Sequence, residues 1–101
     1  MDPERISDFN IADVVKSTAG RDQGKLFYVI DEDPVYLILA NGKDRTLDKP
    51  KRKKRRHVQK VLRSETRVAA KILSGDKVLN SELRRDLAFH VKEMQANNLG
   101  G

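Results

Sequence analysis

The chain has 101 residues, of which 38% are hydrophobic and 36% are charged, a size that suits one small domain with a single core. Its net charge of +6 is unevenly placed: residues 1–48 carry −4 (six basic, ten acidic), residues 49–56 carry +7, and residues 57–101 carry +3 (eight basic, five acidic). These figures exclude a multidomain assembly and point to one strongly basic window.

The chain contains no cysteine, which excludes a disulfide framework and a thiolate metal site and suits a reducing cytoplasm. The longest apolar runs, residues 26–30 and 35–40, are far shorter than the ~20 residues of a membrane-spanning helix. The acidic start lacks the basic and apolar regions of a signal peptide. We therefore expect a cytoplasmic protein with no membrane association.

The first half of the chain predicts a β-meander. Residues 13–18, 26–30 and 35–40 are apolar and β-branched, as strands are, and the second run predicts a strand buried on both faces. Gly20 and Gly24 lie in the connecting turn, where we expect positive φ angles. Asn41-Gly42 predicts a type I′ hairpin into residues 43–47. The fold class is therefore mainly β, the right size for a small closed barrel.

The second half predicts a helical extension. Residues 57–62 fit either a helix or the closing strand of a barrel, and the pattern does not decide between them. Ser64 is a candidate cap for a short helix that ends at Gly75, and Asn80 or Ser81 begins a second helix. That second helix carries an apolar stripe, and residues 97–101 read as a flexible tail. The stripe consists of Leu83, Leu87, His90, Val91 and Met94.

Residues 49–56 predict a solvated loop that binds the nucleic-acid backbone, since its like charges repel one another unless polyanions are near. Because no apolar residue is lost, neutralising the run should leave folding unchanged. The alternative to nucleic-acid binding is that this basic run is a solvated linker or a localisation signal. The candidate phosphate contacts are Lys49, Lys51, Arg52, Lys53, Lys54, Arg55 and Arg56, with His57 beside them.

The glycine turn is a second candidate contact. Its glycines are separated by three residues where a P-loop has four, and Leu26 stands where a P-loop needs Ser or Thr, so we exclude nucleotide hydrolysis there. Arg21, Gln23 and Lys25 would fix the orientation of a bound RNA. A simple strand connection explains the same spacing equally well.

No pattern indicates an enzyme, a cofactor or a small-molecule substrate. His57 and His90 are far apart without metal-ligand spacing, so we expect no metal site, and His90 is expected to be a packed helix residue. Tyr28 and Tyr36 are the two aromatic residues that could be either core or base-stacking side chains.

Residues 14–30, with Gly24 in the turn between two hydrophobic strands, resemble the KOW motif. The continuation through Asn41-Gly42-Lys43, residues 47–54 and His57 is similar to bacterial KOW-domain proteins that resemble large-subunit ribosomal proteins of archaea and eukaryotes. Asn41 replaces the aspartate expected in that hairpin. The resemblance covers about residues 8–62.

The resemblance implies an SH3-like β-barrel that binds RNA, commonly ribosomal RNA, with residues 57–62 as its closing strand. We therefore expect a barrel over residues 8–62 that includes a basic loop at 49–56, a helical extension over residues 63–96, and a monomer that associates with ribosomal particles. Two alternatives stay open. One is a KOW protein-interaction module of the transcription apparatus, and the other is an architectural DNA-binding protein.

Overall fold

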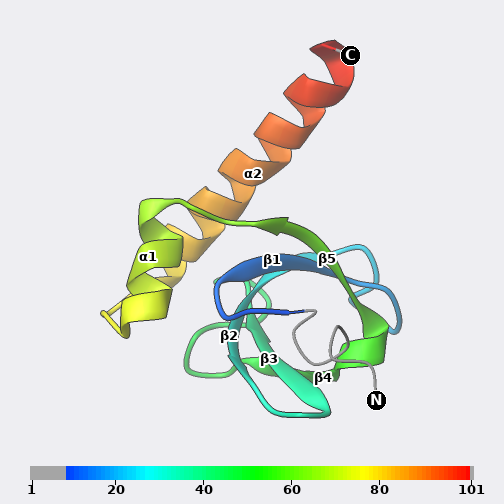
Figure 1. Ribbon diagram of the computed structural model, residues 1–101, viewed down its shortest axis with the longest axis vertical. Coiled ribbons are helices and arrows are strands. Elements are labelled where there is room, and N and C mark those ends of the chain that lie inside the picture. The colour runs from blue at the N-terminus through cyan, green and yellow to red at the C-terminus, as the bar shows by residue number, and fades with distance from the viewer. Residues whose placement is uncertain (1–8, 101) are drawn as a thin grey trace.

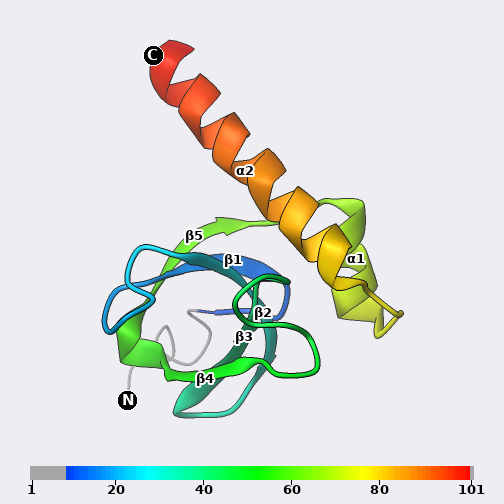
Figure 2. The ribbon, with the colours of Figure 1, turned by 180° about the vertical axis from the view of Figure 1, so that it is seen from behind.

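The computed structural model describes residues 9–100, and the first part of that range is one antiparallel sheet in the order β4-β3-β2-β1-β5 (Figure 1). Register shifts between Val14 and Val15 and between Val29 and Asp31 are β-bulges, which bend a sheet. The sheet accordingly curls, as seen from behind in Figure 2. Its strands are β1 (Asp13–Ser17), β2 (Leu26–Glu32), β3 (Tyr36–Ala40), β4 (Lys51–Lys54) and β5 (Val58–Arg63), and the 3-10 turn η2 (Arg55–His57) joins β4 to β5.

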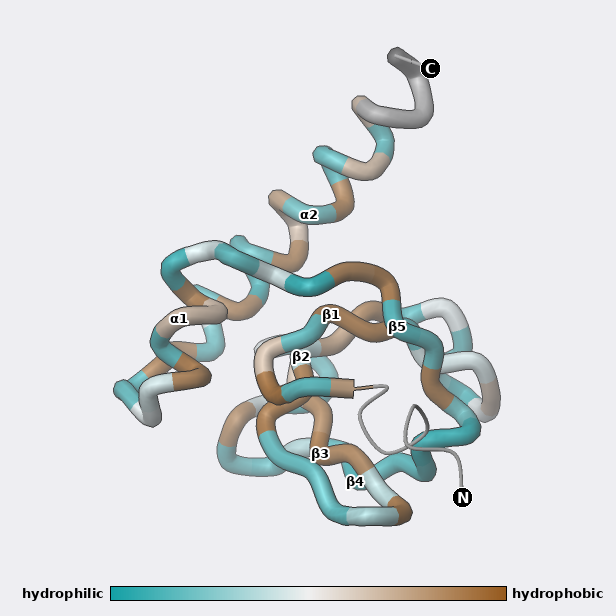
Figure 3. The backbone as a smooth tube through the Cα atoms, viewed as in Figure 1, coloured by the Kyte–Doolittle hydropathy of each residue, from teal (hydrophilic) through white to brown (hydrophobic). Residues whose placement is uncertain are grey.

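The sheet buries apolar side chains on both of its faces, because successive strand residues point to opposite sides. One face forms a core within the curl of the sheet, which includes Phe27, Val29 and Leu37. The opposite face contributes Val14 and Tyr28 to a second core that the helices cover. Figure 3 shows the hydrophobic stretches along β1, β2 and β3, in contrast to the hydrophilic β4.

Helix α1 (Arg67–Ser74) begins after Thr66, whose Oγ1 accepts a hydrogen bond from the Ala69 amide at 3.3 Å. Ser64 was the expected cap, and that prediction is wrong by two residues because Ser64 is buried in contacts with the sheet and α2. Gly75 ends α1 in the left-handed conformation, as predicted.

Helix α2 (Asn80–Gly100) carries the predicted apolar stripe. Its first part is buried against the sheet through Leu83, Leu87 and His90, which confirms His90 as a packed residue. Beyond this contact the helix runs away from the sheet (Figure 1). The backbone remains helical through Gly100, over most of the predicted tail at 97–101, and residue 101 lies outside the described residues.

The strands at residues 13–18, 26–30 and 35–40 are confirmed within one or two residues, and 58–63 is a strand paired with β1. The predicted type I′ hairpin is wrong, because residues 43–47 form no strand. Within residues 9–100 only Ala12 among non-glycine residues has a positive φ, so Asn41 lacks the backbone angle that this turn requires. The Asn41 side chain instead organises a longer loop, accepting hydrogen bonds from the amides of Lys43 and Arg45.

The predicted basic loop at residues 49–56 is also corrected, since its centre is strand β4. Backbone pairing with β3 sets Lys54 opposite Tyr36 and Lys53 opposite Leu37. The hydrogen-bond ladder holds this segment in place although its side chains are all cationic. None of the helices in residues 9–100 is both long and apolar enough to cross a bilayer.

Candidate nucleic-acid interface

Strand β4 divides its cations between the two faces of the sheet. Lys53 lies opposite the buried Leu37 and is itself only 9% exposed, so it points toward the inner core. Arg52 and Lys54 point to the other face, where Arg52 is exposed and Lys54 is half-buried. Seven neighbouring cations are therefore not equivalent, because strand geometry alternates their directions.

Lys53 joins β4 to the glycine turn. Its ammonium donates hydrogen bonds to the Ala19 carbonyl at 2.7 Å and to Asp22 Oδ1 at 2.8 Å. The same Asp22 oxygen accepts a hydrogen bond from the Ser17 hydroxyl at 2.7 Å. These contacts bring together the two predicted contact segments, although they are distant in the sequence. They also direct the Lys53 ammonium into the protein and away from any external ligand.

The charge of Asp22 is stabilised by this arrangement. Burial alone would raise the pKa of its carboxyl, but hydrogen bonds from Lys53 and Ser17 and the positive charges of Lys53 and Lys51 outweigh burial and lower the pKa below its usual value. Asp22 therefore remains an anion that neutralises one cation of β4 from within the protein.

Arg55 is the second cation that the protein neutralises internally. Its guanidinium forms an ion pair with Glu32 and donates from Nε to the Asp33 carbonyl at 3.0 Å. Arg52 behaves differently, because its guanidinium carbon lies 3.7 Å from the centroid of the Tyr36 ring. This stacking fixes the direction of Arg52, which forms no salt bridge in residues 9–100, although its charge also acts on the exposed Asp33 carboxylate.

The glycine turn has the predicted backbone. Gly20 and Gly24 have φ angles of +82° and +88°. A Cβ atom on Gly24 would meet nothing within 4 Å, so the dihedral angle rather than crowding explains that glycine. Arg21, Gln23 and Lys25 are all exposed at this turn.

The turn also borders a shallow depression of about 210 Å³ lined by Arg21, Lys25 and Arg45. Lys25 forms an exposed ion pair with Asp44 at 2.7 Å across it. Arg45 was not among the predicted contacts. Its proximity to the turn depends on the fold of the 41–50 loop, which the sequence pattern misassigned to a hairpin.

The remaining predicted contacts surround β4. Lys49 and Arg56 are exposed, and Lys51 and His57 are half-buried. The His57 carbonyl accepts a hydrogen bond from the Thr18 amide at 2.9 Å, which links η2 to the start of the turn segment. These contacts join residues 18–22 to Lys53 and His57. The exposed cations of the two segments that form no ion pair in residues 9–100 are Arg21, Lys49, Arg52 and Arg56.

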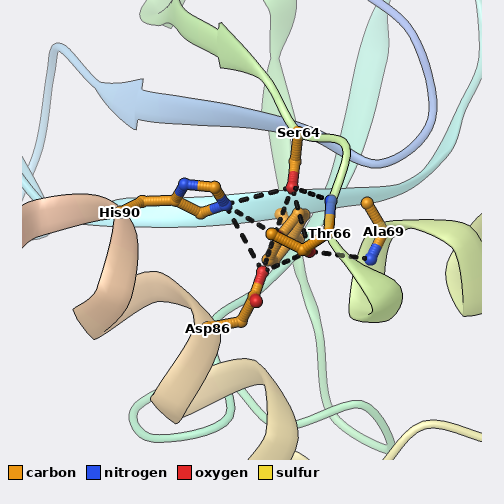
Figure 4. Close-up of polar contacts among 6 residues, drawn as sticks. Ser64, Thr66, Ala69, Asp86 and His90 are labelled. Carbon is orange, nitrogen blue, oxygen red and sulfur yellow. Dashed lines mark hydrogen bonds and ion pairs between the residues drawn. The ribbon is translucent and has the colours of Figure 1, made fainter. Parts of the chain in front are cut away.

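A buried polar cluster outside this region was not foreseen. Ser64, Thr66, Asp86 and His90 meet between the segment before α1 and α2 (Figure 4). The Tyr28 hydroxyl of β2 contacts Ser64 at 2.8 Å and His90 at 3.2 Å. The Tyr28 hydroxyl donates to Asp86, and burial, with a further contribution from Asp86, raises the pKa of Tyr28 to about 12. Tyr28 is therefore a core residue, which answers one of the two open aromatic assignments.

The cluster contains a serine, a histidine and an aspartate but differs from a hydrolase triad. Ser64 Oγ lies 3.0 Å from His90 Nε2, and Asp86 Oδ2 lies 3.4 Å from that same nitrogen. In a catalytic triad the serine and the carboxylate contact different nitrogens of the histidine ring, so that the nitrogen that faces the serine is free to accept its proton. The contacts here tie α2 to the sheet, which is a structural role.

No metal-binding group of three or more His, Asp or Glu side chains occurs in the part of the chain that the structure describes. No protein-family model matches the sequence, and no curated protein is detectably similar to it.

Proposed function

We propose that the chain is a non-catalytic RNA-binding protein of the KOW class, built on an SH3-like barrel and associated with ribosomal RNA. The observation that carries the proposal is the placement of the exposed cations. Arg52 and Arg56 are exposed on or directly after strand β4, and β4 is joined to the glycine turn, which bears the exposed Arg21, through Lys53. Cations held by a sheet lose less conformational entropy on binding than cations on a mobile loop.

A phosphate backbone is the ligand that best fits this surface. Two of the seven cations, Lys53 and Arg55, are neutralised internally, and the others keep their charge without ion pairs in residues 9–100. Release of counterions from RNA phosphates would supply most of the binding free energy and little sequence discrimination. The exposed turn would add orientation, because its side chains project from a hydrogen-bonded strand connection.

The test is a titration of fluorescent RNA by anisotropy at several salt concentrations. The wild type should show a log–log slope of about −3 to −5, at roughly 0.7–0.9 per phosphate neutralised. The triple variant Arg52→Gln, Lys54→Gln, Arg56→Gln should lose about half of that slope. A matched triple variant of cations on and between the two helices, Arg67→Gln, Lys77→Gln and Lys92→Gln, should change the slope much less.

The alternatives give different outcomes in the same experiment. Competition by duplex DNA as strong as by RNA would favour an architectural DNA-binding protein. Co-purification with polymerase factors that survives nuclease treatment would favour a transcription module. A salt-independent affinity, or equal losses in the two triple variants, would contradict the proposed surface.

The turn has its own test within cells. The double variant Arg21→Ala, Lys25→Ala should keep the fold and the non-specific affinity, while moving the protein from ribosomal fractions of a sucrose gradient toward the top. Sedimentation with ribosomal particles equal to that of the wild type would show that the turn is only a strand connection.

A further inference from the structure

A groove of about 480 Å³ lies between helix α2, the end of the glycine turn and the 41–44 loop. Its apolar lining includes Leu26 of β2 with Leu87, Ala88 and Val91 of α2. This volume falls in the range of about 300–1,000 Å³ that is usual for sites of small organic ligands. None of the α2 residues belongs to the surface described above.

The polar rim of the groove is basic. Lys43 is exposed and forms no salt bridge within residues 9–100. Arg84 donates to the Gly42 carbonyl at 2.6 Å, a neutral acceptor that leaves its positive charge in place. The one acidic residue of the lining, Asp44, is already paired with Lys25. The groove therefore combines an apolar surface with a net positive rim, which complements an apolar group that carries an anion.

The two walls of the groove are fixed to each other. Besides the contact from Arg84, the Asn80 side chain accepts a hydrogen bond from the Leu47 amide at 2.8 Å. Gly42 packs so closely on α2 that an added Cβ would lie 2.2 Å from the Asn80 carbonyl oxygen. The loop is thus held against the first turn of α2, and the groove is formed before a ligand arrives.

The groove is continuous with the turn. Lys25 and Asp44 line both this groove and the shallow depression that includes Arg21 and Arg45. A strand of RNA whose phosphates contact the turn would reach the groove within a nucleotide or two. This continuity favours a nucleotide over an acidic peptide as the occupant.

We propose that the groove receives one unpaired nucleotide of the bound RNA, with the base against Leu26, Leu87 and Val91 and a phosphate between Lys43 and Arg84. The inference depends on the proposed RNA-binding function and deepens it, because it makes α2 part of the recognition site. A base turned out of its stack is a common target of RNA-binding proteins. A groove that receives an unpaired base would make the protein prefer single-stranded over duplex RNA. A surface that binds only phosphates would show no such preference.

The first experiment compares Ala88→Glu with Ala70→Glu. Both alanines are exposed on helices and both variants change the net charge equally, but only Ala88 lines the groove. The probe is a mixed-sequence single-stranded RNA of 12 nucleotides. Ala88→Glu should weaken binding about tenfold and Ala70→Glu less than about twofold, with circular dichroism confirming that each variant is folded.

A second pair avoids the helix altogether. Lys43→Gln should weaken binding of the 12-nucleotide RNA about threefold to fivefold, whereas Lys77→Gln, in the exposed connection between the helices, should have little effect. In methyl-labelled protein, base protons of the RNA should give nuclear Overhauser effects to the methyl groups of Leu87 and Val91.

The outcomes separate the two proposals. If the wild type binds the RNA while Ala88→Glu matches Ala70→Glu and no base-to-methyl effects appear, the groove proposal is overturned and the RNA-binding proposal stands. If the wild type binds neither RNA nor its duplex form, both proposals fall. Binding of a polyglutamate peptide in the groove, with no such binding by RNA, would overturn the nucleotide assignment in favour of an acidic protein partner.

Discussion

Replacing Lys53 with methionine should destabilise the protein, although Lys53 belongs to the most highly charged segment of the chain. The side chain is 9% exposed, and its ammonium contacts Asp22 at 2.8 Å and the Ala19 carbonyl at 2.7 Å. Loss of one partner of a buried ion pair costs about 3–5 kcal/mol. Because the Asp22 carboxylate is 14% exposed and regains some hydration, we expect a loss of about 2–3 kcal/mol. Methionine keeps most of the aliphatic stem, so little of this loss is a cavity.

The measurement is urea denaturation followed by circular dichroism. Lys54→Met is the matched control, since this neighbouring lysine is half-buried and has no ion pair in residues 9–100, and it should change stability by less than about 0.5 kcal/mol. In a double-mutant cycle, Asp22→Asn should recover part of the loss caused by Lys53→Met, with a coupling of at least about 1 kcal/mol. Equal effects of the Lys53 and Lys54 substitutions would refute this reasoning and restore the interpretation of the whole run as solvated.

Four further substitutions test the described contacts. Gly42→Ala should lower the free energy of unfolding by more than about 3 kcal/mol, because the added Cβ would lie 2.2 Å from the Asn80 carbonyl oxygen and the φ angle is +76°. Gly24→Ala, at a φ of +88° but in open space, should lower it by only about 1 kcal/mol, as measured by thermal unfolding. Tyr28→Phe should lower the free energy of unfolding by about 1–3 kcal/mol and should remove the phenolate absorbance transition near pH 12. In the wild type, the stability that the protonated Tyr28 hydroxyl contributes should be lost as the pH rises from 10 through 12. The pKa of Asp22 is lowered in the folded protein, so its carboxylate stabilises the fold at pH values above the ordinary pKa of 3.8, and this contribution is lost as the pH falls further. Asp22→Asn should therefore make the free energy of unfolding depend less on pH in the acid range.

The sequence predicted the strands whose identity depends on local pattern. β1, β2 and β3 are apolar and β-branched, and burial on both faces of the sheet explains why their runs are nearly continuous. β4 was missed because Lys51–Lys54 contains no apolar residue at all. Its strand conformation comes from pairing with β3, and such pairing between separate segments leaves no local trace in composition.

The candidate site was predictable in outline only. The glycine turn and the basic run were both identified, but the sequence could not show which cations are neutralised internally. Lys53 pairs with an aspartate 31 residues earlier, and Arg55 pairs with Glu32, 23 residues earlier. The residues of the polar cluster are separated even further in the sequence, since Tyr28 and His90 are 62 residues apart. Residue type and spacing carry no information about contacts of that separation.

The same contacts between distant residues explain why the number of cations in the basic window is a poor guide to the proposed RNA-binding surface. Two cations of the basic run are used to fasten β4 to the turn and to the β2–β3 connection, so they supply the rigidity that the remaining cations need. Arg84 has the converse role: it comes from a helix with no excess of positive charge in the pattern, yet its contact with Gly42 places it beside Lys43 and the turn. The positive field that a ligand meets is therefore set by tertiary contacts, which remove some charges of the basic window and add others from distant segments. A variant that reverses either kind of contact should alter RNA affinity without changing the net charge of the chain.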